Sequence, residues 1–362
     1  MTGRERVKAA IEFQPTDCIP VGPYMANHCS VLAGYRLRDC YTDGETLARA
    51  QLRSFEFYGQ DIINVQADNY YIPEGFGAKI FMPEEGNHTP SMEAPILSEL
   101  SEADALPRLD PERDGRMPVY LTAMRRLREA VGNRAALRAC GVGPFTLAAH
   151  LRGTEQFLID TFEALADGDE EKKSQLLTLL SRCTDLLCDF ALAMLDAGAD
   201  IVQCADSLAS LDMISPSIYE AFAYPFEREF FRRMKAPAAA HGAHRLLHIC
   251  GGNSAVYPLF RTLDADLIEI DSKVDLAYAK EQLAGSHTAI IGNLAPVATL
   301  LQGTPAEVER AAREAIEKTG GEGFILGSGC EVPIGAPAGN IEAMIRTARS
   351  FVRSSRDGRS FS

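Results

Sequence analysis

The chain of 362 residues lacks the features that mark membrane and secreted proteins. No apolar run reaches the roughly 18 residues that a membrane-spanning helix needs. Residues 1–6 contain none of the apolar stretch of a secretory signal. Nine cysteines are sparse for this length and odd in number, which argues against a disulfide framework. We therefore expect a cytoplasmic protein that does not enter a membrane.

The sequence also lacks a basic surface segment and the glycine-rich loops of nucleotide-binding proteins. It has 36 basic and 50 acidic residues, and its formal net charge of −14 repels nucleic acids. No G-x-x-x-x-G-K-[ST] loop occurs, and no G-x-G-x-x-G follows the first predicted strand. We expect neither a nucleic-acid partner nor nucleotide-dependent chemistry.

Eight short apolar runs do recur along the chain. Most contain valine or isoleucine and end near glycine, aspartate, asparagine or proline, which is typical of buried parallel strands. The runs cover residues 19–24, 62–66, 136–142, 201–204, 245–250, 267–270, 289–292 and 324–326.

Helical patterns separate most of these runs. One apolar stripe at three- and four-residue steps consists of Leu176, Leu180, Cys183, Leu187, Phe190 and Met194. A capping box with proline at the first helical position starts at Thr304, and Ser215 precedes another such proline. Eight rounds of strand and helix predict an α/β fold, a (β/α)8 TIM barrel that forms a single domain over residues 1–352.

Two segments depart from this alternation. Residues 67–115 are rich in proline, glycine and acidic side chains, and they are too long for a simple connection. We expect them to form an N-terminal excursion over the barrel mouth, with a small hairpin around residues 78–82. Residues 353–362 are predicted to be a polar C-terminal tail.

Polar residues follow the predicted strands at the ends where barrel enzymes place their active sites. We expect five of them to bind substrate, although aspartate and asparagine at such positions also cap loops and helices routinely. These five are Asp68, Asn69, Asp206, Asp271 and Asn293.

A histidine and two cysteines form the sharpest chemical pattern. His248 and Cys250 are two positions apart on a predicted strand, so both side chains point to one face. Cys330 follows the last predicted strand, which ends at the same mouth. One imidazole and two thiolates are a known ligand set for catalytic zinc, with a fourth position left open. The alternative is a buried histidine beside core thiols.

Residues 247–253, Leu-His-Ile-Cys-Gly-Gly-Asn, closely resemble the zinc segment of the methylcobalamin:coenzyme M methyltransferases, which belong to the uroporphyrinogen decarboxylase superfamily. Residues 143–148, 215–226, 291–296 and 329–333 look like the same family, so the resemblance covers nearly the whole chain. It implies a (β/α)8 barrel in which His248, Cys250 and Cys330 ligate Zn²⁺ and are catalytic. It also implies a corrinoid (cobalamin) cofactor carried by a partner protein.

This resemblance leaves several functions open. The complete histidine–cysteine–cysteine set favours methyl transfer between the corrinoid protein and a thiol such as coenzyme M. A second possibility is a methyl donor:corrinoid protein methyltransferase, for example one that demethylates aryl methyl ethers. A uroporphyrinogen decarboxylase is less favoured, since residues 22–28 hold no arginine or lysine to bind its carboxylates. A structural zinc in a non-enzymatic protein is disfavoured by a set of three ligands rather than four.

Overall fold

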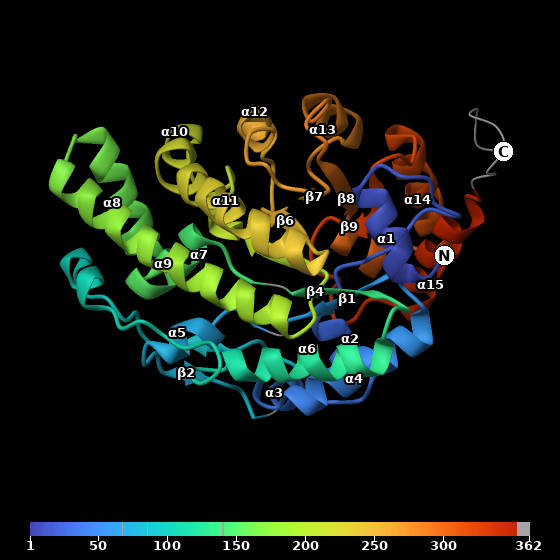
Figure 1. Ribbon diagram of the computed structural model, residues 1–362, viewed down its shortest axis with the longest axis horizontal. Coiled ribbons are helices and arrows are strands. Elements are labelled where there is room, and N and C mark those ends of the chain that lie inside the picture. Colours follow the sequence, from blue (N-terminus) through green and yellow to red (C-terminus); the bar gives the residue numbers. More distant parts are fainter. Residues whose placement is uncertain (67, 85, 140, 353–362) are drawn as a thin grey trace.

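A curled parallel sheet of seven strands forms the centre of the molecule (Figure 1). The computed structural model describes residues 1–66, 68–84, 86–139 and 141–352, and the predicted tail at 353–362 lies outside the described residues. The strands follow one another in chain order around the sheet. They are β1 (Ile62–Val65), β4 (Ala136–Ala139), β5 (Ile201–Ala205), β6 (His244–His248), β7 (Leu267–Ile270), β8 (Ala289–Leu294) and β9 (Phe324–Ser328).

The concave side of the sheet holds an apolar layer with a polar layer above it. Each of the seven strands contributes to one buried apolar cluster, which packs against helix α1 (Gly3–Ile11). Because side chains two positions apart share a face of a strand, the residues two steps further along also point inward. On five strands these are polar and buried, namely Asn64, Arg138, Gln203, His248 and Glu269.

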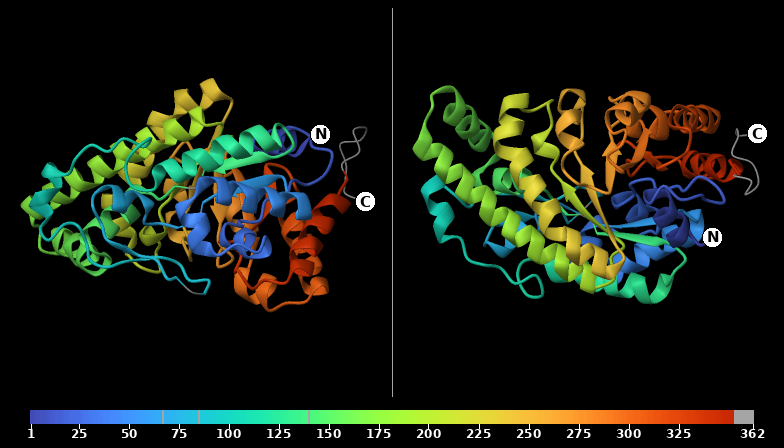
Figure 2. Two further views of the ribbon diagram at one scale, coloured as in Figure 1. Left: turned by 90° about the horizontal axis from the view of Figure 1, so that it is seen from below. Right: turned by 45° about the horizontal axis from the view of Figure 1, so that its top comes forward.

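Helices cover the outer face of the sheet (Figure 2). The predicted apolar stripe lies on α9 (Glu170–Asp196), and all six of its residues are buried. The predicted capping box at Thr304 starts α14 (Pro305–Thr319), and Ser215 caps α10 (Pro216–Ile218). The other α-helices are α2 (Asn27–Leu32), α3 (Leu37–Thr42), α4 (Gly44–Tyr58), α5 (Tyr71–Gly75), α6 (Met117–Val131), α7 (Pro144–Arg152), α8 (Thr154–Ala166), α11 (Tyr224–His241), α12 (Tyr257–Phe260), α13 (Leu276–Gln282) and α15 (Ala338–Ser350). Within the described ranges, no helix combines the length and apolar character needed to cross a membrane.

The first predicted strand, at residues 19–24, differs from the expectation. It makes a single parallel bridge, between Val21 and Leu326 of β9, and is not a strand of the sheet. Two backbone hydrogen bonds of 2.9 Å join the segment to Leu326, and the Val21 carbonyl accepts one of 2.8 Å from the Asp61 N–H beside β1. The segment therefore lies between the two edges of the curled sheet.

Two prolines explain why this segment does not form a regular ladder. Pro20 and Pro23 carry no N–H group, so neither can donate a hydrogen bond to a neighbouring strand. Proline is accordingly confined to the ends and edges of strands. The strand was predicted because residues 19–24 are apolar. Apolar character indicates that a segment is buried, but it does not show how many backbone N–H groups can donate hydrogen bonds to a neighbouring strand.

The connection after β1 is long, as expected, and it contains a small antiparallel strand pair. Only the first of the two strands lies at the residues predicted for the hairpin, 78–82. Strands β2 (Ile80–Phe81) and β3 (Ser91–Met92) pair antiparallel. A 3₁₀ helix, η1 (Leu100–Ala105), follows them and packs against α9. The chain returns to the regular alternation at α6.

Candidate metal centre

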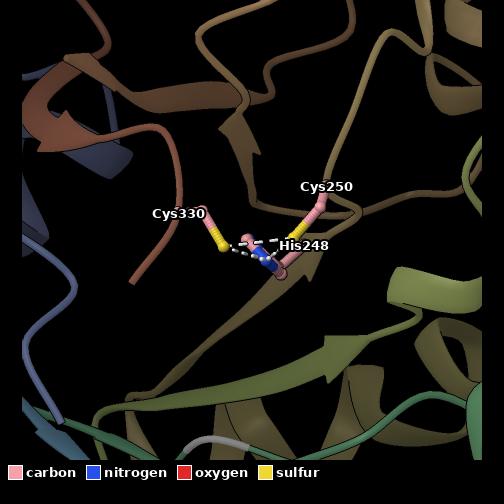
Figure 3. A group of neighbouring side chains, drawn as sticks. All are labelled: His248, Cys250 and Cys330. Carbon is pink, nitrogen blue, oxygen red and sulfur yellow. Dashed lines mark hydrogen bonds between the residues drawn. The ribbon is translucent and has the colours of Figure 1, made fainter. Parts of the chain in front are cut away.

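His248, Cys250 and Cys330 converge at the end of the curled sheet (Figure 3). The His248 Nε2 atom lies 3.1 Å from the Cys250 Sγ and 3.9 Å from the Cys330 Sγ. The two sulfur atoms are 3.2 Å apart. In the part of the chain that the structure describes, this is the one group of three or more histidine, cysteine or carboxylate side chains placed to hold a metal ion.

The three side chains reach this point from two elements. His248 is the last residue of β6, and Cys250 lies two residues beyond it in the following turn rather than in the strand. Gly251 has a φ of +92°, and a Cβ atom there would lie 2.4 Å from the Ser210 Oγ. Glycine is therefore required where the chain turns away after Cys250. Cys330 follows β9 by two residues.

Two glycines precede Cys330, and each lies very close to a neighbouring element. A Cβ atom on Gly329 would lie 2.5 Å from the Ser272 backbone N, in the loop that follows β7. A Cβ atom on Gly327 would lie 2.7 Å from a side-chain carbon of Ile291 in β8. These glycines let the end of β9 pack closely against its neighbours, which sets the position of Cys330.

The three side chains shift one another's pKa values through their hydrogen bonds and charges. The pKa of the Cys250 thiol is lowered, because the Cys330 thiol donates a hydrogen bond to its sulfur and the imidazolium of His248 lies beside it. The pKa of Cys330 is raised by that same shared proton and by burial. Burial alone would lower the pKa of His248, but the Cys250 thiolate and Glu269 raise it. Binding a cation at the three donor atoms would release these protons.

The geometry and the chemistry of the donors fit a zinc ion. Zinc lies about 2.0–2.3 Å from imidazole nitrogen and thiolate sulfur. Donor atoms separated by 3.1, 3.2 and 3.9 Å can all contact one ion at such distances. Sulfur donors select zinc or another soft metal over magnesium and calcium, which prefer oxygen. Three protein donors leave a coordination position open, as in catalytic zinc sites.

A buried carboxylate holds the far side of the imidazole. Glu269 is the register partner of His248 on the adjacent β7. Its Oε2 lies 2.6 Å from the His248 Nδ1. Burial raises the pKa of Glu269, but Arg138 and His248 outweigh that effect and lower it to about 2. A carboxylate on Nδ1 fixes the imidazole tautomer that presents the Nε2 lone pair to a metal.

The sequence reasoning missed both Glu269 and Arg138. Each is a charged residue inside an otherwise apolar strand, in Leu267–Ile270 and Ala136–Ala139. Charged side chains are almost never fully buried unless they are paired. That rule was the available signal, since two opposite charges in two buried strands point to an internal ion pair.

Asp271 and Asn293 lie next to the candidate site and support its loops. The Asp271 carboxylate accepts hydrogen bonds from the backbone N–H groups of Gly251 and Lys273, both at 2.9 Å. Asn293 lies within β8 rather than after it, and its amide donates to the carbonyls of Asp271 and Val274. Their hydrogen bonds therefore shape the turn after Cys250 and the loop after β7.

Asp68 and Asn69 lie in the excursion and differ in their surroundings. Asp68 is buried, and its carboxylate accepts hydrogen bonds from Arg116 and from the Tyr120 hydroxyl. Asn69 is exposed and accepts a hydrogen bond of 3.0 Å from Gln66. Gln66 in turn accepts one from the hydroxyl of Tyr24. Asn69 is thereby connected to Tyr24, whose ring contacts His248 edge-on at 5.7 Å.

Asp206 lies at the end of β5 but is fully buried. Its carboxylate accepts hydrogen bonds from the backbone N–H groups of Phe145 and Thr146, at 3.1 and 2.6 Å. These are donors of the first turn of α7, so Asp206 caps that helix from a neighbouring element. Burial raises the pKa of Asp206 to about 6, against the lowering effect of those hydrogen bonds.

A second buried carboxyl lies near Asp206 and gives a pH-dependent prediction. Burial raises the pKa of Glu227 well above its usual range, and the charge of Asp206 adds to the effect. The folded chain keeps this proton at pH values where the unfolded chain has lost it. The contribution of Glu227 to stability must then fall as pH rises above about 4.5, by up to about 1.4 kcal/mol per pH unit. We expect Glu227→Gln to remove this contribution, so that its advantage over the parent protein grows with pH.

Urea unfolding between about pH 5 and pH 8 measures this slope directly. Glu229→Gln is the matched control, because Glu229 lies on the same helix but pairs with Arg232 at the surface. A parent protein and a Glu227→Gln variant with parallel pH profiles would show that Glu227 is ionised in the fold.

A family model described as uroporphyrinogen decarboxylase (URO-D) matches residues 2–351. Among similar proteins is the methylcobamide:CoM methyltransferase MtbA of Methanosarcina mazei, 27% identical over 97% of this chain and 98% of its own length. A uroporphyrinogen decarboxylase of Microcystis aeruginosa is 28% identical over 72% of this chain and 71% of its own length.

A solved structure described as a methyltransferase from Methanosarcina mazei superposes on this chain with a TM-score of 0.85. It is 24% identical in sequence, and the match covers 97% of this chain and 99% of the other. The likeness shows that the two chains share their fold over almost their full length.

Proposed function

This chain belongs to the uroporphyrinogen decarboxylase family, and from that premise we propose that it transfers a methyl group between a corrinoid and a thiol at a zinc site. The corrinoid is carried by a partner protein, and the thiol is a small molecule such as coenzyme M. His248, Cys250 and Cys330 are the zinc ligands. Their convergence on one point at the end of the sheet is the observation that carries the proposal.

Two further observations support methyl transfer over decarboxylation. The relative named as a methylcobamide:CoM methyltransferase aligns with 97% of this chain, and the relative named as a decarboxylase aligns with 72%. Residues 22–28 contain no arginine or lysine. Decarboxylation of a substrate with many carboxylates needs cationic side chains and no metal, so it gives no role to His248, Cys250 and Cys330.

When bound, a zinc ion would keep a coordinated thiol in its thiolate form at neutral pH, which makes the thiol nucleophilic. The residues of this chain supply the orientation. Glu269 keeps the proton of His248 on Nδ1, so that Nε2 is free to act as a donor. The Ser207 hydroxyl lies 3.6 Å from the Cys250 Sγ and offers that sulfur a hydrogen bond. The thiol is thereby held at a fixed point where a methyl group can be presented in line.

A methyl donor:corrinoid methyltransferase remains the second candidate. In that reaction the corrinoid is the nucleophile, and the metal site would activate the leaving group of the donor. The same three ligands would hold the metal for methyl transfer from the donor to the corrinoid.

The chain is further proposed to close its sheet into a (β/α)8 barrel that forms one domain over residues 1–352. The segment at 19–24 would take the place of the eighth strand. Its hydrogen bonds to Leu326 on one side and Asp61 on the other support this proposal. The excursion would then cover part of the mouth, where Asn69 is the exposed candidate for contacting substrate. Asp271 and Asn293 would act by shaping the loops beside the zinc.

Anaerobic incubation with methylcobalamin tests the reaction. We expect about one zinc per chain and thiol-dependent loss of the methylcobalamin spectrum when coenzyme M or another small thiol is added. Conversion of cob(I)alamin by a methoxylated or methylated donor, without thiol activity, would favour the second candidate. Zinc-free protein that decarboxylates uroporphyrinogen would overturn both.

A further inference from the structure

A buried arginine crosses the interior of the sheet behind the candidate zinc site. Arg138 lies on β4, and its side chain is 0% exposed, as is that of its partner Glu269 on β7. The guanidinium donates two hydrogen bonds to this carboxylate, of 2.9 Å to Oε1 and 2.5 Å to Oε2. Strands β5 and β6 separate β4 from β7 in the sheet, so the pair spans the concave side.

The guanidinium is fixed on other sides as well. Its Nε donates to the Oε1 of Gln203 on β5. The ring of Tyr24 covers one face, with its centroid 4.6 Å from the Arg138 Cζ. The same ring contacts His248 by its edge. A planar guanidinium with this many contacts has one orientation available to it.

Glu269 transmits that orientation to the imidazole. Its Oε2 accepts from Arg138 and also lies 2.6 Å from the His248 Nδ1. A carboxylate with two oxygens held by one guanidinium cannot rotate without breaking a bidentate pair. The imidazole is thereby fixed with Nε2 directed toward the sulfur atoms of Cys250 and Cys330.

We infer that Arg138 is a positioning residue for the metal site, which acts through Glu269 to hold His248 in its metal-binding orientation. The inference rests on the proposed zinc site and deepens it. Arg138 does not itself face substrate, because its hydrogen bonds and its stacking contact commit it to this network. The side chain sets how tightly the site holds its metal.

A double-mutant cycle on zinc affinity tests the inference. The variants are Arg138→Met, Glu269→Gln and the double variant, with affinity measured by competition against a chromophoric zinc chelator. Groups that orient a metal-bound histidine typically contribute about 10–100-fold to affinity. We expect a loss of that size in each single variant, with saturation still at one zinc per chain. The double variant should lie within about 3-fold of Glu269→Gln, because Arg138 acts only through that residue.

The cobalt(II)-substituted protein gives a second readout. The visible ligand-field bands of cobalt(II) depend on how the imidazole is oriented at the metal. If Arg138 only stabilised the fold, its replacement would leave these bands unchanged. We expect the bands of Arg138→Met to shift relative to those of the parent protein. Arg138→Lys retains the charge but cannot form the bidentate pair, so its affinity should fall between those of the parent and Arg138→Met.

The outcomes separate this inference from the proposed function. Parent protein that binds zinc through the three ligands, with an unchanged affinity in Arg138→Met, would overturn the inference alone. The inference would also be overturned if the double variant lost as much zinc affinity relative to Glu269→Gln as Arg138→Met loses relative to the parent. Arg138 would then act independently of Glu269. If Arg138→Met does not fold, the zinc affinity of Arg138→Lys relative to the parent still tests the inference, because this variant keeps a positive charge beside Glu269 but not the bidentate pair. An affinity equal to that of the parent would then overturn the inference. Parent protein without zinc would overturn both proposals.

Discussion

Cys330→Ser is expected to lower the zinc content from about one per chain to a small fraction and to slow methyl transfer by about 10³-fold. A serine hydroxyl is not ionised at neutral pH, and it is a much poorer ligand than a thiolate. Loss of this donor leaves His248 and Cys250 as the remaining pair of the cluster. Metal catalysis contributes several kcal/mol to such reactions, and each 1.4 kcal/mol is a factor of ten in rate.

The matched control is Cys188→Ala, which removes a buried thiol of α9 that belongs to the apolar core. It should lower stability modestly and leave the zinc content and the rate per folded molecule unchanged. Zinc content by atomic spectroscopy and the decay of methylcobalamin absorbance report the two effects separately. A Cys330→Ser protein that keeps a full zinc and its activity would exclude this residue as a ligand.

Seven of the eight predicted strands form the sheet, because buried parallel strands carry a continuous apolar signal in the sequence. The positions of His248 and Cys250 followed from the period of a strand, and that of Cys330 from the rule that barrel strands end at one mouth. These are local or topological regularities, so a single sequence contains them. The exact strand end was not predictable, and Cys250 lies beyond it.

The carboxylates at the strand ends show the limit of this reasoning. Asp68 binds Arg116, and Asp206 caps a helix, although both follow strands in the way a substrate-binding residue would. The sequence places each carboxylate near the mouth but does not reveal its hydrogen-bond partner. That partner is 48 positions away for Asp68 and 60 positions away for Asp206.

The ion pair of Arg138 and Glu269 was missed for the same reason, because its members are 131 positions apart. The two-residue period of a strand, applied to each predicted strand in turn, could have identified the inward-facing polar layer that contains both residues. Five strands carry a polar residue two positions after an apolar residue that packs into the interior. These polar residues are Asn64, Arg138, Gln203, His248 and Glu269. Two opposite charges in one inward-facing layer predict a pair.

Asp61→Ala is expected to lower the free energy of unfolding by about 3–5 kcal/mol, which is typical of breaking a buried charge pair. Asp61 is almost completely buried beside β1. Its carboxylate accepts hydrogen bonds from Arg6 at 2.6 Å, from Arg349 at 2.8 Å and from the Val21 backbone N–H at 2.8 Å. One side chain therefore joins the first helix, the last helix and the segment that lies between β9 and β1.

Asp17→Asn is the control that makes this measurement specific. Asp17 also accepts hydrogen bonds from Arg6, but its side chain is 42% exposed. Exposed ion pairs contribute about 0–1 kcal/mol, so this variant should lose little stability in urea or guanidinium unfolding. Equal effects of the two variants would mean that Arg6 alone carries the stabilisation. A much larger effect of Asp61→Ala would instead show that stability depends on the buried carboxylate that joins α1, α15 and residues 19–24. That segment ends at Tyr24, whose ring contacts both Arg138 and His248. The proposed closure of the sheet and the proposed metal site therefore depend on the same stretch of chain.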